Sequence, residues 1–450
     1  MPVLRRLVVS SFLRPTTRYP QRPAAFYSTQ RKVSDPLRIL FCGSDEYSCA
    51  SLKALYAEHK ANQALIKSID VLVRPAKPTG RGLKKLREVP VVQLARELQL
   101  PIHEKEGFIN PNWNLPQHDG EPINLIIAVS FGLFISPRVI RDAKYGGLNL
   151  HPSLLPDLKG PAPLHHALLN RRTHTGISLQ TLSERSYDAG TVLAQTPLPG
   201  IPIPASCTLA ELHAMVTEPS AEMLVAGLRA GVHVPPHADV GWAQADPPAK
   251  DTLVHAPKLT SEDRQIVWSS MSAADAALRE RATGALWTNV VSQEERQFGD
   301  KKSLHRQPIV RVAFEGVSEA SEEESALFEA TAQDLREVPK DFTPFIEDPN
   351  YRMVAFMQIP KPPQFMGAPK LLKTDRYKGP FVSSFVESTN MTPVFLMPDM
   401  SILIRMPQGG YLKVAKMKGA GHQVAHPAAR FVAKIGARMC RISPNRKNWE

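Results

Sequence analysis

The stretch LRILFCGSD, residues 37–45, sets the fold class of this 450-residue chain. Its first seven residues form an apolar run that ends in Gly, which is typical of a buried strand. Ser44 and Asp45 can then cap a helix. Apolar residues at helical spacing follow, at Ala50, Leu52, Leu55 and Tyr56. With a second apolar run at Ile69–Val73, this strand–helix–strand unit predicts a parallel α/β sheet, where ligands bind beyond the carboxyl ends of the strands.

Further elements follow in the first half of the chain. Strands are predicted at Ile123–Ser130, Gly147–His151, Thr175–Leu182 and Thr191–Leu198. Pro90 begins one predicted helix, and the capping box TLAE at 208–211 opens another that runs to about Gly227. Between residues 74 and 89, two Pro and two Gly predict a loop without regular structure that presents six basic side chains.

The second half of the chain has a different pattern. Residues 232–251 are rich in Pro, Ala and His and predict a linker, followed by helical structure over 256–295 and a strand at 306–314. Residues 315–348 hold 11 acids and two bases with little apolar periodicity, which predicts a solvated, disordered insertion. Short β-rich runs at 393–397, 401–405 and 411–417, with Gly409-Gly410 as a hairpin turn, predict a small antiparallel barrel.

These elements predict an α/β, Rossmann-like parallel-sheet domain followed by a C-terminal OB-like β-barrel. The predicted boundaries are a leader at 1–34, a first domain at 35–230, a linker at 231–255, and a second domain at 256–450 that carries the acidic insertion at about 316–380.

The net charge of +12 is unevenly distributed. Residues 1–34 contain seven Lys or Arg and no acid, residues 351–450 carry a net +12, and residues 35–350 carry a net −7. An Arg-rich, acid-free leader is typical of a mitochondrial transit peptide, with a disordered basic tail as the alternative. The basic C-terminal segment favours a polyanionic partner such as a nucleic acid over a merely solvated basic surface.

Several classes of protein are disfavoured by composition. Hydrophobic residues make up 43% of the chain and charged residues 22%, so it is not disordered throughout. The longest apolar run, 125–135, is too short to cross a bilayer. Four scattered Cys do not form a disulfide framework or a zinc site. His165-His166 lacks a third ligand at metal spacing and is predicted to lie on a helix surface.

Three polar residues carry the candidate chemistry. Asn149 and His151 lie two apart on a predicted strand, so their side chains share a face at its carboxyl end. An Asn amide can stabilise an oxyanion, and a His can donate a hydrogen bond or move a proton. Asp188, in a turn before a later strand, is the candidate carboxylate beside the imidazole. No Ser or Cys is placed for a covalent acyl-enzyme, so direct attack by an amine on a carbonyl fits this set better, although such a pair alone is more often structural.

The run GLNLHPSLLP at 147–156, followed by KGPAP at 159–163, resembles the signature of the 10-formyltetrahydrofolate-dependent formyltransferases. The resemblance implies that Asn149, His151 and Asp188 are catalytic, with the Asp in the turn 188–190, and that no metal takes part. It implies a co-substrate, 10-formyltetrahydrofolate, bound by Ser130, Phe131, Gly132, Leu133, Ser153, Leu154, Leu155 and Pro156. The chain departs from the family at Pro152, where Gly is frequent, and at Ala189, where Thr is common.

Three further stretches resemble the branch of this family that formylates methionyl-tRNA: FCGS at 41–44, GRGLKKL at 80–86, and APKL at 256–259 together with IVW at 266–268. The resemblance implies formylation of initiator methionyl-tRNA for translation in the mitochondrial matrix, by a monomer. It implies tRNA contacts at Arg81, Lys84, Lys85, Lys413, Lys416 and Lys418, while Leu83 adds a residue to the basic loop. The alternatives are a formyltransferase with a small amine acceptor, such as glycinamide ribonucleotide or an amino sugar, and a non-catalytic RNA-binding protein.

Overall fold

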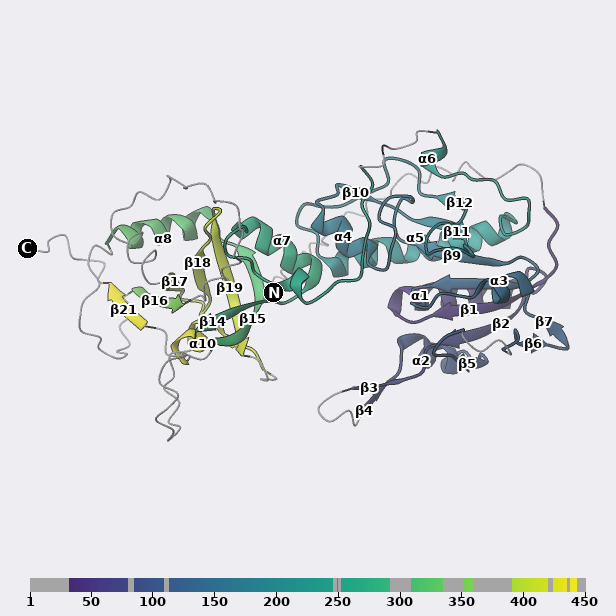
Figure 1. Cartoon of the computed structure of the whole chain (residues 1–450), viewed down its shortest axis with the longest axis horizontal. Helices are drawn as coiled ribbons and strands as arrows, with labels where there is room; N and C mark the ends of the chain where they lie inside the picture. The colour runs from purple at the N-terminus through teal and green to yellow at the C-terminus, as the bar shows by residue number, and fades with distance from the viewer. Residues whose placement is uncertain are drawn as a thin grey trace, which may run out of the picture.

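The computed structural model describes residues 32–79, 85–108, 113–245, 249, 252–291, 309–334, 352–358, 391–419, 424–434 and 438–442. They form two lobes, seen at the right and left of Figure 1. The chain passes from the core of the first lobe at Ala256 to that of the second at Ile266. All but the last three residues of the predicted transit peptide lie outside the described residues. Within the described ranges, no helix has the length and apolar character needed to cross a membrane.

A seven-stranded sheet forms the first lobe, in the order β12-β11-β9-β8-β1-β2-β5. Its strands are β1 (Leu37–Gly43), β2 (Ile66–Val73), β5 (Ile102–Glu104), β8 (Leu125–Val129), β9 (Gly147–His151), β11 (Ser178–Thr181) and β12 (Val192–Gln195). The five from β9 to β5 are parallel, whereas β11 runs antiparallel to β9 and β12 antiparallel to β11. The predicted parallel α/β sheet is confirmed, with an antiparallel edge added.

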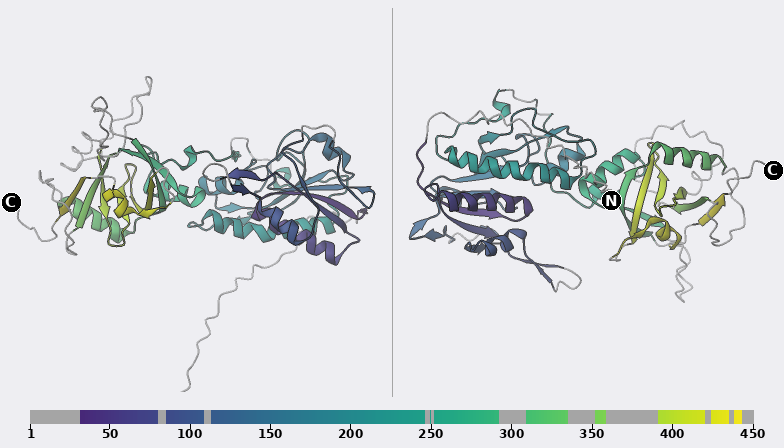
Figure 2. Two further views of the ribbon diagram at one scale, coloured as in Figure 1. Left: turned by 90° about the horizontal axis from the view of Figure 1, so that it is seen from below. Right: turned by 180° about the vertical axis from the view of Figure 1, so that it is seen from behind.

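Helices cover both faces of this sheet. They are α1 (Glu46–Ala61), α2 (Pro90–Glu97), α3 (Pro137–Asp142), α4 (Pro163–Leu169), α5 (Leu209–Arg229) and α6 (Trp242–Ala245). Helix α1 starts where predicted, because the Asp45 side chain accepts a hydrogen bond from the Ser48 N–H at 3.0 Å. The predicted capping box at Thr208 and Glu211 opens α5. Figure 2 shows α1 and α5 side by side on one face, while α3 packs on the other.

The second lobe is an eight-stranded antiparallel sheet in the order β14-β15-β19-β18-β17-β16-β21, with β20 beside β19. Its strands are β14 (Leu286–Val291), β15 (Ile309–Glu319), β16 (Arg352–Gln358), β17 (Met391–Leu396), β18 (Ile402–Arg405), β19 (Tyr411–Gly419), β20 (His426–Pro427) and β21 (Arg438–Ile442). The sheet curls, because β14 near one end contacts β16 near the other. This arrangement agrees with the predicted barrel, and Gly409-Gly410 joins β18 to β19 as predicted.

The predicted loop at 74–89 differs from the structure. Strands β3 (Lys77–Thr79) and β4 (Lys85–Arg87) pair antiparallel and form the stem of a hairpin. Pro78 lies within β3, opposite Leu86. A Pro is tolerated in such a two-stranded ribbon because only one partner strand needs its N–H groups.

The predicted helix over 256–295 is mostly wrong. The segment opens in extended form, continues through the short 3-10 helix η3 (Glu262–Arg264) to α7 (Ala273–Thr283), and ends in β14. The overlooked signal is alternation, since Leu286, Thr288 and Val290 are all buried on one side of β14. A capping box at Ser272 and Asp275 marks the true start of the helix.

The acidic segment is not wholly solvated. Residues up to Glu319 extend β15, and α8 (Glu322–Asp334) packs on the sheet. Phe328 is 1% exposed, with its ring centroid 3.8 Å from that of Phe395 and 4.5 Å from that of Tyr411. One buried aromatic side chain therefore anchors a helix whose acidic composition concealed it. Among the residues that the structure describes, this lobe also contains the helix α10 (Ala428–Lys434).

Candidate active site

A cavity of about 660 Å³ opens beyond the carboxyl ends of β8 and β9, the edge of the sheet where the sequence predicted the site. Asn149, His151 and Asp188 all line it. Asn149 and His151 come from the end of β9, and Asp188 from the turn between β11 and β12. The antiparallel pairing of β11 with β9 sets Gln180 beside Asn149, so the turn after β11 returns to the cavity.

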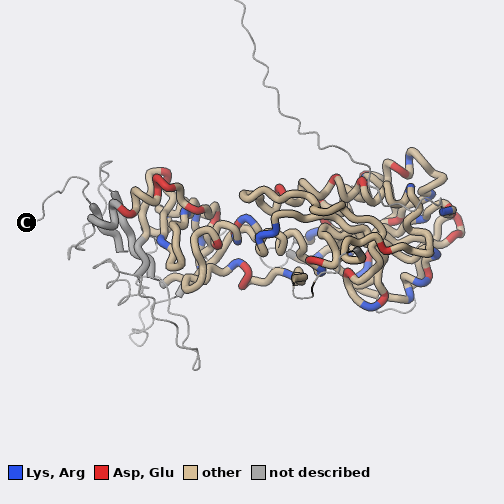
Figure 3. Tube along the Cα trace, turned by 90° about the horizontal axis from the view of Figure 1, so that it is seen from above, with Lys and Arg blue, Asp and Glu red and all other residues tan. Residues whose placement is uncertain are grey.

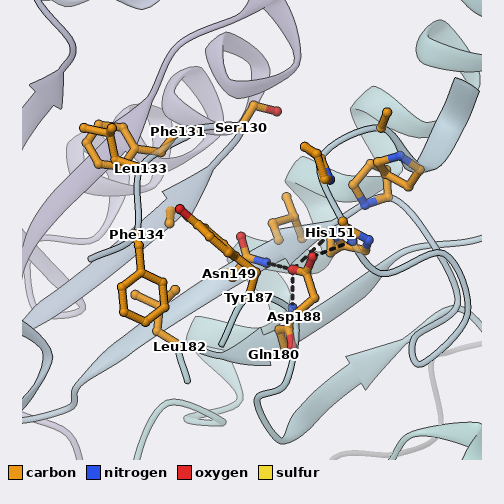
Figure 4. Close-up of a pocket in the computed structure, with 18 of the residues that line it drawn as sticks. Ser130, Phe131, Leu133, Phe134, Asn149, His151, Gln180, Leu182, Tyr187 and Asp188 are labelled. Atoms are coloured by element: carbon orange, nitrogen blue, oxygen red, sulfur yellow. Dashed lines mark hydrogen bonds and ion pairs between the residues drawn. The ribbon is translucent and has the colours of Figure 1, made fainter. Parts of the chain in front are cut away.

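The three predicted catalytic side chains converge on one carboxylate (Figure 4). Asn149 Nδ2 donates to Asp188 Oδ1 at 3.1 Å, and His151 Nδ1 lies 3.4 Å from the same oxygen. The side chains of His151 and Asp188 are 7% and 9% exposed. The pair is therefore largely shielded from solvent, where an electrostatic contact is stronger than in water.

Both ring nitrogens of His151 face hydrogen-bond acceptors. Nδ1 faces Asp188, and Nε2 lies 3.1 Å from the main-chain oxygen of Leu158. A neutral imidazole has one donor nitrogen, whereas an imidazolium has two. A neutral His151 can therefore donate to one of these two acceptors, and a charged ring to both.

Asp188 is held by neighbours on several sides. Its carboxylate accepts hydrogen bonds from Gln180 Nε2 at 3.0 Å and from the Gly160 N–H at 2.9 Å. Gln180 Oε1 in turn accepts from the Gly190 N–H at 3.1 Å. The turn tolerates no side chain at Gly190, because a Cβ there would lie 1.8 Å from the oxygen of Thr181. Asp188 is therefore held in place by the loop before α4 and by its own hairpin.

An aromatic and apolar wall faces this polar cluster. Of the predicted folate residues, Ser130, Phe131, Gly132 and Leu133 line the cavity. Phe134 and Tyr187 stack edge to face with centroids 5.2 Å apart (Figure 4). Such a wall suits a flat heterocycle, since aromatic faces bind planar rings well.

The other predicted folate residues, Ser153–Pro156, are not among those lining the cavity. Ser153 is buried and its hydroxyl donates to the main-chain oxygen of Asp157 at 2.7 Å, and Leu155 is also buried. These residues shape the loop that follows β9. Their contact with a folate stays a prediction.

The predicted basic tRNA loop is only partly described. Arg81 and Lys84 lie outside the described residues, and Lys85 is the first residue of β4. The strand partner of Lys85 is Thr79. Contact with tRNA stays a prediction for all three.

The predicted basic residues on β19 have different surroundings. Lys413 Nζ lies 2.6 Å from Glu324 Oε1 and 2.8 Å from Asp399 Oδ2, and these two acids raise the pKa of Lys413. Lys418 lies 4.0 Å from Glu315, whereas Lys416 is exposed. Figure 3 shows Asp and Glu interspersed with Lys and Arg over the described part of this lobe. Lys416 is therefore better placed than Lys413 to meet a phosphate.

Several cavity residues were missed from the sequence. Gln180 carries no motif, and its contact with Asp188 depends on the pairing of β11 with β9. His165, predicted to lie on a helix surface, lines the cavity with His213. Burial lowers the pKa of His165 to about 4 and also lowers the pKa of His213.

Among the residues that the structure describes, no group of three or more His, Cys, Asp or Glu could hold a metal ion.

Comparisons with known proteins agree with this geometry. The family described as “Formyl transferase” matches residues 37–228. The mitochondrial methionyl-tRNA formyltransferase of Bos taurus is 31% identical over 250 residues, covering 55% of this chain and 57% of the relative. The mitochondrial enzyme of that name from Saccharomyces cerevisiae is 33% identical over 275 residues, covering 53% and 66%. The methionyl-tRNA formyltransferase of Hahella chejuensis is 30% identical over 237 residues, covering 53% and 69%. The chain thus spans less than two thirds of the length of the first two relatives.

Proposed function

The chain belongs to the formyl transferase family, and on this premise we propose that it transfers the formyl group of 10-formyltetrahydrofolate to the α-amine of methionyl-tRNA. The observation that carries the proposal is the convergence of Asn149, His151 and Asp188 at one cavity. The names of the relatives supply the acceptor.

The proposed reaction needs no covalent enzyme intermediate. The amine attacks the formyl carbon, and the carbonyl oxygen becomes an oxyanion that Asn149 Nδ2 and protonated His151 stabilise. The bond from the formyl carbon to N10 then breaks, one proton leaves the attacking amine, and one joins N10. Asp188, beside His151 Nδ1, holds the positive charge of the ring and can pass protons through water.

The two substrates occupy different parts of the cavity in this proposal. The folate ring lies against the wall that includes residues 130–133, where main-chain groups can meet the pterin. Residues 153–156 would border the folate side of the cleft. The acceptor end of the tRNA enters from the basic β3–β4 hairpin, through Arg81, Lys84 and Lys85. Phosphates further along the tRNA meet the second lobe at Lys413, Lys416 and Lys418.

The cellular setting forms part of the same proposal. The Arg-rich leader and the mitochondrial relatives support action in the mitochondrial matrix, on initiator methionyl-tRNA. We propose that the enzyme acts as a monomer with domain boundaries at 35–230 and 256–450, and that residues of about 316–380 are an insertion in the second domain.

The test is formyl transfer by the purified full chain. The enzyme is mixed with 10-formyltetrahydrofolate and labelled methionyl-tRNA, and label is followed into formyl-methionyl-tRNA. Glycinamide ribonucleotide and buffer serve as parallel acceptors, and Asp188→Asn is the inactive control. We expect transfer to the tRNA alone.

Other outcomes would contradict parts of the proposal. Transfer to glycinamide ribonucleotide alone would support formyl transfer by this site but exclude methionyl-tRNA as the acceptor. Binding of tRNA without any transfer would favour a non-catalytic RNA-binding protein over an enzyme.

A further inference from the structure

We propose that Asp157 and Arg172 are positioning residues, which fasten the segment between the two lobes to the loop that orients His151 and Asp188. The loop comprises residues 157–162. The segment, called the connector below, comprises residues 252–258 and leads into the second lobe. The proposal rests on the proposed function only for its activity readout.

The loop touches both members of the catalytic pair through its main chain. The oxygen of Leu158 lies 3.1 Å from His151 Nε2. The N–H of Gly160 donates to Asp188 Oδ2 at 2.9 Å. A shift of the loop by an ångström would therefore change the surroundings of both side chains, and such shifts are large on the scale of catalytic geometry.

The connector holds the opposite side of the loop. The Leu158 N–H donates to the oxygen of Val254 at 2.8 Å, and the Ala256 N–H donates to the oxygen of Lys159 at 2.7 Å. The Ala162 N–H donates to the oxygen of Ala256 at 3.2 Å. The N–H groups of residues 158 and 162 thus donate to the connector, and the N–H of residue 160 between them donates to Asp188.

The approach between loop and connector is close at Gly160. A Cβ at this position would lie 2.4 Å from the oxygen of Ala256, and its φ of +124° is one that L side chains rarely adopt. A Gly is therefore required at position 160 for the main chain of Ala256 to lie this close to the N–H that binds Asp188.

Asp157 and Arg172 lock this arrangement with side chains. Asp157 Oδ1 accepts from the Val254 N–H at 2.9 Å, and Arg172 Nη2 lies 3.1 Å from Oδ1 and 3.0 Å from Oδ2 of the same carboxylate. Arg172 Nη2 also lies 3.4 Å from the oxygen of Thr252. The two side chains are 20% and 34% exposed, so the contact is partly shielded from solvent. Supporting contacts of this kind fix the geometry of a site without touching substrate.

The experiment compares three variants in steady-state formyl transfer. Asp157→Ala removes both the Val254 and the Arg172 contacts, whereas Asp157→Asn and Arg172→Ala each keep an acceptor for the Val254 N–H. We expect Asp157→Ala to lower kcat about 10- to 100-fold, with KM for folate and for tRNA within about twofold of wild type. The kcat values of Asp157→Asn and Arg172→Ala should lie between those of Asp157→Ala and wild type.

A neighbouring residue provides the matched control. Arg171 pairs with Asp275 of the second lobe at 2.6 Å and touches neither the loop nor the connector through any contact described above. Arg171→Ala should leave kcat within about twofold of wild type, since exposed pairs contribute little. A loss equal to that of Asp157→Ala would show that lobe orientation, not the loop, sets the rate, and would overturn the inference.

A second readout does not depend on the reaction. Hydrogen exchange of the peptide containing Leu158, Gly160 and Ala162 should be faster in Asp157→Ala and partly restored in Asp157→Asn. Unchanged hydrogen exchange in Asp157→Ala would overturn the inference. Failure of the wild-type protein to formylate tRNA would overturn only the proposed function. Wild-type kcat in Asp157→Ala, or a raised KM with unchanged kcat, would also overturn the inference. If Asp157→Ala fails to fold, the two milder variants carry the same comparison.

Discussion

His151 Nδ1 and Asp188 Oδ1 lie 3.4 Å apart, although one residue ends a parallel strand and the other sits in a turn between antiparallel strands. The contact exists because β11 reverses direction beside β9 and brings its following turn back to the same edge. Any change that displaces this turn would therefore separate the two side chains.

Removing either member of the pair should abolish transfer but not tRNA binding. His151→Ala removes the proposed oxyanion donor, and Asp188→Asn removes the charge beside the ring. We expect each to lower single-turnover formylation by at least about 100-fold. Filter binding of methionyl-tRNA should stay within about twofold of wild type, and affinity that fell in parallel with activity would contradict these roles.

Gly190→Ala should displace the turn that carries Asp188. The added Cβ would lie 1.8 Å from the oxygen of Thr181, so the main chain must move. We expect loss of about 1–3 kcal/mol in the free energy of unfolding and a marked loss of formyl transfer. Gly107→Ala is the control, because a Cβ there has no atom within 4 Å. Equal effects in denaturant titration and activity would refute the steric explanation.

Stability should fall on the acid side of pH 6.5 partly because of His233. This fully buried ring has its pKa lowered to about 4 by burial, with smaller contributions from His237 and Lys32. Above pH 6.5 the ring is neutral in both folded and unfolded chains. Below pH 6.5 this imidazole binds a proton in the unfolded chain but stays neutral in the folded chain. The free energy of unfolding therefore falls as the pH is lowered, by at most about 3 kcal/mol near pH 4.

The check is urea unfolding of wild type and His233→Asn at several values between pH 4 and pH 7. The variant should lose stability less steeply as the pH falls. Parallel curves for the two proteins would remove His233 from the acid dependence.

Phe328→Ala should destabilise the second lobe. The ring is 1% exposed and stacks on Phe395 and Tyr411, so its loss should cost about 3–5 kcal/mol. Hydrogen exchange of peptides from β17 to β19 would report this change. Glu323→Ala, on the exposed side of α8, should change exchange little. Identical protection in both variants would contradict a stabilising role for the packing of α8 on the sheet.

Lys416→Ala should weaken tRNA binding in a salt-dependent way. An exposed Lys that meets a phosphate releases counterion, so its loss should lower the slope of log affinity against log salt by about one. Titrations of methionyl-tRNA at several salt concentrations provide the measurement. An unchanged slope would exclude Lys416 from the interface.

The first lobe could largely be predicted from the sequence because its signals are local. Apolar runs gave β1, β8 and β9, and the spacing of Asn149 and His151 placed both at one strand end. Side-chain oxygens in the sequence marked the starts of α1 and α5 correctly. Buried strands and helix starts of this kind depend on residues that are close together in the sequence, so they can be predicted from it.

The parts that could not be predicted depend on distant contacts. The role of Gln180 requires the register of β11 on β9, and the placement of His165 depends on which side of α4 meets the cavity. The helix α8 was hidden because the one buried aromatic side chain described in it, Phe328, stands among acids. Strand β14 was missed because alternation of Leu286, Thr288 and Val290 was read as helical.

The close approach of Gly160 to Ala256 bears on how the two halves of this chain can be exchanged during evolution or in chimaeras. A fragment that stops at residue 230 keeps Asn149, His151 and Asp188 but lacks Val254 and Ala256, whose main chain bonds the loop beside them. A recombination point placed in the Pro-rich stretch would therefore have to leave residues 252–258 with the first half. We therefore expect the smallest exchangeable unit that keeps this loop in place to extend to residue 258, past the predicted start of the second domain at 256.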